Sequence, residues 1–400
     1  MGVGRRGVGV AVGCLVAALV VVSVADAGVV RKTPASAYQA NGTVRSIVVD
    51  GATTYLGGQF TAMIPSGGGS PVTRHGVAAV STATGALLPW NPNVNGTVYA
   101  ITVGPTGAVY LGGTFTTVGG VSYRNVVEVD GVTGAPITTF ANALRPNRTV
   151  RALAISGGSL FVGGAFTTPE RYAAKVDATT GGLIRAWAPV IANVYGTSPE
   201  VRAIAVDPSG TRVILGGFFN RLNSGAPGDP DPTNVGIGAV DPTTGASLPW
   251  AWHTADLQTF RPFQLLSFTQ DGSTLFGAGS GNGGSAMSWN IETGALNYIE
   301  GFNGNVVGVG VADGNLYIGG HFTGYDGPIP GNNFLTPIAM RDKLCAVDEA
   351  TGTILSPWNP SVNTNLGIEA LSAGGTTVAI GGEFTRVAGI PQQHFTLFQE

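Results

Sequence analysis

The chain has 400 residues, of which 63 are glycine, and only 11% are charged. Hydrophobic residues still make up 44%, which excludes a disordered chain, and the glycines keep no three-residue period, which excludes collagen. The net charge of −3 gives no basic surface for nucleic acid, so we expect no such partner. Because Gly, Val and Thr outnumber good helix formers, the composition favours a large all-β protein with many tight turns.

The N-terminal residues 1–27 have the pattern of a signal peptide. Arg5 and Arg6 precede an apolar run, and Ala25-Asp26-Ala27 fits a small-x-small cleavage site. We therefore expect cleavage after Ala27, which would give a secreted or cell-surface protein. Two alternatives stay open, twin-arginine export and a retained membrane anchor, since the apolar run approaches the length that spans a bilayer.

One unit recurs along the remaining residues, 28–400, which we predict to be a single domain. An apolar run that ends in two glycines, one variable residue and then Phe occurs six times, and Gly277–Gly279 is a degenerate copy. We expect another backbone close to these glycines, or a bulge at them. The complete copies are Gly57–Phe60, Gly112–Phe115, Gly163–Phe166, Gly216–Phe219, Gly319–Phe322 and Gly381–Phe384.

A second signature, Thr-Gly, alternates with the first. An acid three residues before the Thr fits a turn in which the carboxylate accepts backbone N–H bonds, and the glycine closes the hairpin. Repetition at a turn favours this structural role over metal binding. The acids are Asp130, Asp177, Asp241 and Asp348, with Asn290 and Ser81 in the other two copies. Trp90, Trp187, Trp250 and Trp358 follow these turns, and we expect them to pack between neighbouring units.

Four strands are predicted in each unit. In the second unit they are Val98–Val103, Ala108–Phe115, Val126–Asp130 and a fourth that starts near Gly134. Seven such units in series predict an all-β fold, a seven-bladed β-propeller of four-stranded blades.

The two ends of the chain predict how the ring closes. The last unit stops after its third strand, His394–Gln399, and the stretch Val29–Ser36 stands before the first strand of the first unit. We expect this N-terminal stretch to be the missing fourth strand and to pair with the C-terminal third strand. Such pairing would leave no free sheet edge.

At this point the pattern resembles the delta-60-type propeller repeats of secreted bacterial proteins, which are kelch-like and WD-like. The resemblance covers about residues 28–400 and rests on Tyr110–Phe115, Arg124, Asp130–Gly134 and the Pro-Trp pairs of Leu88–Trp90 and Ser356–Trp358. It implies a propeller that more often serves as an interaction module than as an enzyme. The Tyr-to-Trp spacing of kelch repeats is missing.

A quinoprotein docking motif is only approximated in this chain. Ala239–Trp250 comes close to it, but the Trp falls five residues after Gly245 rather than four, and no neighbouring cysteine pair is available. We therefore expect no quinone and no other cofactor.

The candidate binding residues lie in loops that depart from the repeat. The second-to-third-strand loops carry insertions at Thr61–His75, Asn220–Asn234 and Thr323–Asp342, and the long fourth-to-first-strand connection Ala251–Pro262 is expected on the same face. Aromatic and polar groups there suit a protein or carbohydrate ligand. The alternative is that the aromatic residues only anchor their own loop. The proposed ligand-binding residues are Trp252, His253, Asp256, Arg261, Tyr325 and Asp326.

Asp229, Asp231 and Asn234 are a calcium-loop candidate, because they offer oxygen ligands at alternating positions. No bidentate Glu follows within twelve residues of Asp229, and two prolines stiffen the segment, so we expect no metal.

The sequence favours a secreted, non-enzymatic binding module for a protein or carbohydrate partner, with membrane contact only through an uncleaved N-terminal segment. No nucleophile elbow, zinc-type histidine helix or phosphate loop is present, so no catalytic residue is assigned. The alternative is a propeller hydrolase or lyase that acts on polysaccharide with loop carboxylates. Carboxylates or histidines with raised pKa at the channel mouth would favour the enzyme. A channel lined by Thr, Ser and Gly would favour the binding module.

Overall fold

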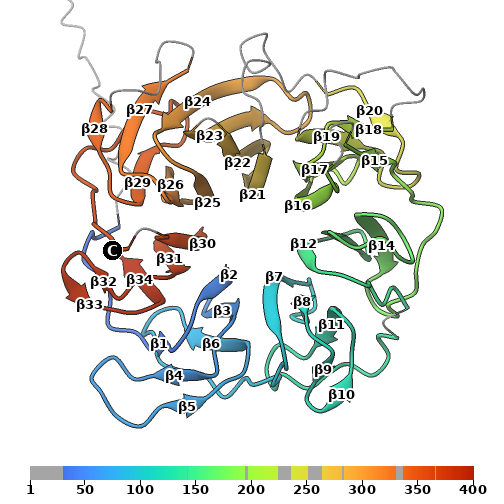
Figure 1. Cartoon of the computed structure of the whole chain (residues 1–400), viewed down its shortest axis with the longest axis horizontal. Coiled ribbons are helices and arrows are strands. Elements are labelled where there is room, and N and C mark those ends of the chain that lie inside the picture. The colour runs from blue at the N-terminus through green and yellow to red at the C-terminus, as the bar shows by residue number, and fades with distance from the viewer. Residues whose placement is uncertain are drawn as a thin grey trace, which may run out of the picture.

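The computed structural model describes residues 30–141, 143–193, 197–223, 236–250, 264–281, 283–329, 337–364 and 366–400. All regular elements in these residues are β-strands, as the composition predicts. No helix among them is suited to cross a membrane. Figure 1 shows the sheets side by side around a common centre, with the first strand of each nearest that centre.

The repeated sheets are antiparallel, and each contains three strands that follow one another in the sheet. The second strand, which ends in the paired glycines, lies between the first and the third. In chain order the sheets are β2 (Val44–Asp50), β3 (Thr53–Gly58) and β6 (Val77–Ser81); β7 (Thr97–Val103), β8 (Val109–Thr114) and β11 (Val126–Val129); β12 (Val150–Ser156), β13 (Ser159–Gly164) and β14 (Ala173–Asp177); β16 (Glu200–Val206), β17 (Val213–Phe218) and β19 (Ile237–Val240); β21 (Gln264–Asp271), β22 (Thr274–Gly281) and β23 (Gly283–Asn290); β25 (Val306–Ala312), β26 (Asn315–Gly320) and β29 (Leu344–Asp348); β30 (Ile368–Gly374), β31 (Thr377–Gly382) and β34 (Phe395–Gln399).

The predicted fourth strand is mostly reduced, which corrects the expectation of four-stranded units. It is a full strand as β24 (Leu296–Phe302) and a two-residue strand as β20 (Ser247–Leu248). In four other units a single bridge takes its place, as between Val80 and Leu87. Proline cannot donate to a sheet ladder, and it stands in or soon after this stretch wherever the strand is short. These prolines are Pro89, Pro136, Pro189, Pro249 and Pro357.

Short strands outside the three-stranded repeat come mainly from the loops after the second strands. Most form small separate sheets, whereas one pair extends the sheet of β24. The small sheets are β1 (Gln39–Ala40) with β4 (Ala62–Ile64) and β5 (Val72–Thr73), β9 (Thr117–Val118) with β10 (Val121–Ser122), β15 (Ile191–Ala192) with β18 (Arg221–Leu222), and β32 (Arg386–Val387) with β33 (Ile390–Pro391). The pair beside β24 is β27 (Gly324–Pro328) and β28 (Ala339–Met340).

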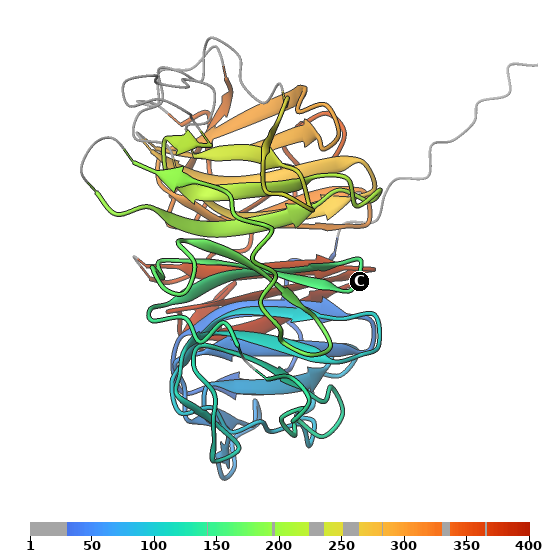
Figure 2. The same cartoon turned by 90° about the vertical axis from the view of Figure 1, so that its right-hand side faces the viewer.

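The paired glycines lie where other atoms approach closely, as predicted. A Cβ on Gly57 would stand 2.7 Å from Cγ1 of Val98 in the next sheet, and one on Gly58 would stand 2.2 Å from the Thr43 carbonyl oxygen. A Cβ on Gly381 would stand 2.6 Å from Cγ1 of Val44. The last sheet therefore packs on the first in the same way as each sheet packs on the next. Figure 2 shows the N-terminal and C-terminal sheets side by side.

The N-terminal stretch lies along β34. The backbone N–H of Arg31 donates to the Gln399 carbonyl at 2.9 Å, and that of Ala35 donates to the Leu397 carbonyl at 2.7 Å. The stretch bends at residues 32–33 and contains Pro34, so residues 30–36 are not the regular strand that the sequence predicted. The stretch therefore contacts β34 through these two backbone bonds and adds no strand to its sheet.

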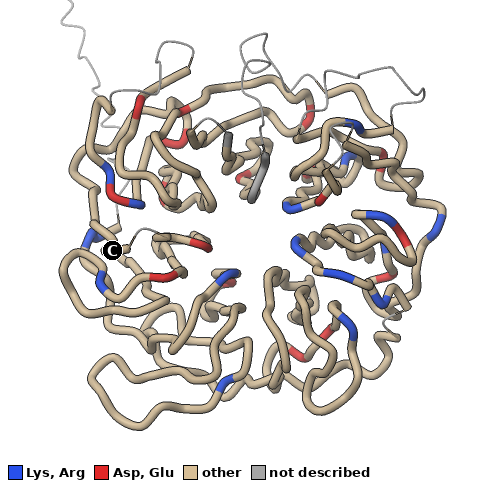
Figure 3. Tube along the Cα trace, viewed as in Figure 1, with Lys and Arg blue, Asp and Glu red and all other residues tan. Residues whose placement is uncertain are grey.

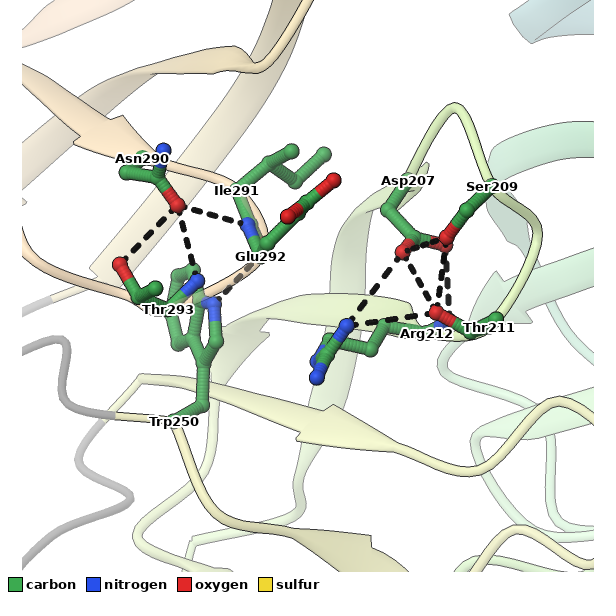
Figure 4. Close-up of polar contacts among 9 residues, drawn as sticks. All are labelled: Asp207, Ser209, Thr211, Arg212, Trp250, Asn290, Ile291, Glu292 and Thr293. Carbon is green, nitrogen blue, oxygen red and sulfur yellow. Dashed lines mark hydrogen bonds and ion pairs between the residues drawn. The ribbon is translucent and has the colours of Figure 1, made fainter.

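The acids before Thr-Gly are turn residues, as predicted. Oδ1 of Asp130 accepts from the backbone N–H groups of Thr133 at 2.6 Å and Val132 at 3.1 Å. The bonds from Thr133 hold the pKa of the Asp130 carboxyl below its usual value. Asn290 accepts the equivalent bonds from Glu292 and Thr293 (Figure 4).

The tryptophans join neighbouring units, which confirms the packing prediction. In three units the indole N–H donates to a backbone carbonyl in the following unit. The described residues offer Trp358 Nε1 no partner. The carbonyl of Gln399, which stands in the place of Asp130, accepts from Arg31 instead. The three bonds are Trp90 to Asp130 at 3.0 Å, Trp187 to Asp241 at 3.0 Å and Trp250 to Ile291 at 2.8 Å (Figure 4).

Candidate functional site at the axis of the ring of sheets

The first strand of every repeated sheet contains a β-bulge at the same position. The pairing with the second strand shifts there by one residue, for example between Val44 and Ser46 in β2. A bulge re-aims the side chain of the extra residue. The bulge residues are Arg45, Tyr99, Arg151, Arg202, Leu266, Val307 and Glu369.

Bulge residues from six of these strands line one cavity of about 380 Å³, which we call the axial cavity. Ser280, Asn305 and His321 complete its lining. Ser280 lies near the end of a second strand, His321 follows another and Asn305 precedes a first strand, so the cavity opens toward the loops in which the insertions occur. Figure 3 shows charged positions of both signs on the innermost strands.

A smaller chamber of about 220 Å³ continues from the axial cavity along the first strands. It shares the bulge residues but is otherwise lined mainly by apolar side chains, among them Ile47, Ile101, Leu153 and Ile204. The polar bulge residues therefore border both spaces, and apolar side chains are added along the smaller one.

One side of the axial cavity is positively charged. Nε of Arg151 donates to one carboxylate oxygen of Glu200 at 2.8 Å, and Nε of Arg202 donates to the other at 2.6 Å. Burial opposes ionisation of Glu200, but the two guanidinium groups outweigh it and lower the pKa of this carboxyl. Two cations thus share one anion, which leaves one net positive charge.

The facing side carries the opposite charge. Nη1 of Arg45 lies 3.2 Å from Oε2 of Glu369, and its Nη2 lies 3.9 Å from Oε1 of Glu383. Nε2 of His321 lies 3.5 Å from the other oxygen of Glu369. Apart from the histidine, one arginine balances two carboxylates on this side, which leaves one net negative charge.

Tyr99 lies between the two charged sides. The Arg151 guanidinium carbon is 4.2 Å from the centre of the Tyr99 ring, and that of Arg45 is 5.9 Å from it. Both distances are within the range of a cation–π interaction. The ring therefore orders the two arginines and is not free to stack on a ligand.

Asparagines fix the loops around the cavity mouth. Oδ1 of Asn41 accepts from the backbone N–H groups of Thr61 and Ala62, while Nδ2 donates to Oγ1 of Thr61. Each such residue joins the turn before a first strand to the loop after the following second strand, which makes the rim rigid. Asn95, Asn147, Asn303 and Asn363 form the same contacts in other units.

Most of the sequence-predicted ligand-binding residues lie outside the described residues. This holds for Trp252, His253, Asp256 and Arg261, and also for the calcium candidates Asp229, Asp231 and Asn234. Within the described residues, no group of three His, Cys, Asp or Glu side chains is arranged to hold a metal ion.

Tyr325 and Asp326 are buried, which corrects the expectation that they present a ligand-binding surface. Their relative exposures are 3% and 0%. The insertion that contains them folds into β27, which pairs with β24 and β28 in one sheet, and Tyr325 packs in a hydrophobic cluster with Phe302. The Tyr325 hydroxyl donates to Oε2 of Glu300 within this sheet. The hydrogen-bonding capacity of the Tyr325 side chain is therefore already used inside the protein.

The sequence analysis missed the axial residues, although they occupy the same position in each repeat. Each comes one position after an apolar residue at or next to the start of the first strand, as in Val44-Arg45, Val150-Arg151 and Val201-Arg202. The signal was a repeat position whose side chain changes in character from unit to unit, whereas the residue before it is always aliphatic and the residue after it is always small. Only the bulge directs this position toward the axis.

The fold is similar to that of solved structures, one of which is a WD40 β-propeller. The sequence matches no protein-family model and no curated protein. The computationally designed Ika8 protein is similar in structure with a TM-score of 0.51 at 14% identity, over 93% of this chain and 100% of that chain. The WD40 β-propeller domain of Doa1 gives a TM-score of 0.53 at 11% identity, over 92% and 96% of the two chains. The chain therefore has an all-β fold that is similar to a WD40 β-propeller.

Proposed function

We propose that this protein is a secreted, non-enzymatic binding module that holds a protein or carbohydrate partner on the face around the mouth of the axial cavity. The observation that carries the proposal is the axial cavity itself. Its bulge residues come one from each of six sheets, and asparagine contacts hold its rim. Rigid scaffolds with variable residues at one opening are typical of binding surfaces.

The proposal includes a particular ring. We infer seven blades of the delta-60 type, closed by the N-terminal stretch against the C-terminal third strand. The bonds from Arg31 to Gln399 and from Ala35 to Leu397 support this closure. So does the approach of Gly381 to Val44, which repeats the contact between consecutive sheets.

The chemistry of the cavity favours binding over catalysis. Glu200, beside the cavity, has a lowered pKa because of its two arginines, whereas a general acid needs a raised one. Burial raises the pKa of Glu300 and Glu349 to about 7, but neither residue lines the axial cavity. The hydrolase or lyase alternative therefore has no support from the cavity.

Two substitutions in one unit test which face binds. Thr114→Arg alters an exposed residue at the cavity side, whereas Thr106→Arg alters an exposed residue in the turn at the opposite end of the same sheet. The full chain is immobilised, exposed to cell-surface proteins and to a glycan array, and the retained partner is identified. We expect the Thr114 variant to lose the partner and the Thr106 variant to keep it.

The reverse result would assign the partner to the opposite face. Release of sugar products by the wild-type protein would favour the enzyme. We also propose that the same face includes Trp252, His253, Asp256 and Arg261. The Trp252→Ala variant is therefore measured in the same experiment. Equal retention by this variant would remove that loop from the proposal.

We also propose export with cleavage after Ala27. N-terminal sequencing of protein recovered outside the cells is expected to begin at Gly28. Recovery in the membrane fraction with residues 1–27 intact would instead indicate a membrane anchor. We propose that the protein contacts a membrane only through such an uncleaved segment.

A further inference from the structure

We propose that the axial cavity binds a carboxylate group presented by a protein partner, and that Arg151 and Arg202 hold this group. The inference rests on the proposed binding function and gives it a ligand chemistry. It uses the positively charged side of the cavity, which is built from two adjacent first strands, β12 and β16.

The two arginines have unused donors. Each binds Glu200 through its Nε, and within the part of the chain that the structure describes their terminal nitrogens donate no hydrogen bond. Their side chains are 32% and 34% exposed, and both line the cavity. Guanidinium groups with free terminal nitrogens suit carboxylate geometry, because two parallel N–H bonds reach two oxygens.

Glu200 fixes the arginines without neutralising them. It is 11% exposed on its side chain and uses one oxygen for each guanidinium. Because the pair of guanidinium groups is already ordered by this bridge, a ligand carboxylate would bind without the cost of immobilising two long side chains.

The rest of the cavity orients the ligand. Glu369 and Glu383, on the opposite side, repel an anion and leave the Arg151 and Arg202 side as its favourable position. A single carboxylate therefore has one preferred position in the cavity.

The cavity favours a peptide carboxylate over an acidic sugar. Sugars bind proteins largely through exposed aromatic faces, and the aromatic ring of this cavity, Tyr99, has Arg151 over it at 4.2 Å. An Asp or Glu side chain at the tip of a protein segment needs only the guanidinium donors and room for a few carbon atoms. The chamber of about 220 Å³ beneath accepts apolar atoms next to the acid.

The test uses an array of 12-residue peptides with a central Asp or Glu, and the same peptides with Asn or Gln. The full chain is applied, and the peptides that bind are measured in solution by fluorescence polarisation. We expect the acid-to-amide change to weaken binding at least tenfold, and affinity to fall with rising salt.

Protein variants locate the site. Arg202→Gln is expected to weaken binding of the acidic peptide at least tenfold. Val307→Glu, which adds an anion to the cavity without removing a charged residue, is expected to do the same. The control is Arg185→Gln, whose ion pair with Glu170 is not among the cavity residues and which should bind like the wild type.

Several results would overturn the inference. Equal binding of acid and amide peptides would reject the carboxylate site, and so would unchanged affinity in both cavity variants. The binding module would still be supported if the wild type retained a partner that the Thr114→Arg variant lost. Binding of oligouronates but of no acidic peptide would reject the protein partner. If the wild-type protein bound nothing in either the partner screen or the peptide array, the proposed function would be rejected as well.

Discussion

The turn after the third strand and the bulge in the first strand are both repeated backbone features, but they treat their side chains in opposite ways. The turn has an acid or its amide in five of the six Thr-Gly copies, and the side chain bonds to its own backbone, as in Asp130. The bulge has Arg, Tyr, Arg, Arg, Leu, Val and Glu in successive sheets.

The difference separates structure from function. A residue that is repeated with its contacts is needed for the turn to form. At a position whose backbone is repeated but whose side chain varies, folding does not require a particular side chain. The side chain at such a position is therefore available to bind a ligand. Four substitutions, from the largest expected effect to the smallest, test this distinction.

The largest effect is expected at the repeated glycines. In Gly113→Ala the new Cβ would stand 2.1 Å from the Thr97 carbonyl oxygen, and the backbone cannot move away without breaking the sheet. We expect a loss of at least about 3 kcal/mol in the free energy of unfolding, measured by urea denaturation. Gly67→Ala is the control, because nothing lies within 4 Å of its added Cβ. Equal stability of the two variants would contradict the close approach.

The second effect concerns the carboxylate that two arginines share. Glu200→Gln removes the charge that pairs with Arg151 and Arg202, and we expect a loss of about 1–2 kcal/mol at neutral pH. The pKa of Glu200 is lowered in the folded state, so its stabilisation is present above the unfolded-state pKa and is lost as the pH falls through the folded-state pKa.

The difference between wild type and Glu200→Gln should therefore shrink in acid. Glu170→Gln, which breaks an ion pair with the 69% exposed Arg185, is the control and should change stability much less. A difference that grows as the pH falls would contradict the assigned pairing.

A smaller effect is expected at the turn. Asp130→Ala removes the acceptor for two backbone N–H groups and should cost about 1 kcal/mol in urea denaturation. Asp130→Asn should be nearly neutral, since Asn290 makes the same bonds in another unit. If Asn were as harmful as Ala, charge rather than acceptor geometry would hold the turn.

The smallest effect is expected at a bulge. Tyr99→Val introduces the residue that the equivalent bulge position 307 already has, and Val has a high β-strand propensity. We expect stability to change by less than about 1 kcal/mol, with the slope of the denaturation curve unchanged. A loss as large as that of Gly113→Ala would make the bulge residue structural and break the comparison.

The sequence by itself determined the repeat, the paired-glycine strands, the Asp turns and the inter-unit tryptophans. These are predictable because each depends on local geometry that only certain residues permit, such as a missing Cβ at Gly57 or an acceptor at Asp130. The shortened fourth strands were also within reach, since Pro136 and its counterparts stand in or soon after them.

Only the tertiary structure decided the candidate site. Arg45, Arg151 and Arg202 are more than fifty residues apart in sequence, and each looks like an ordinary strand residue. A bulge in each strand turns the side chain toward the axis, and packing of the sheets brings the three together in one cavity. In the same way, the fold places Tyr325 in a hydrophobic cluster with Phe302 and Phe322, although its loop looked exposed in sequence. Burial and proximity of this kind depend on which strands become neighbours, and local residue patterns do not contain that information.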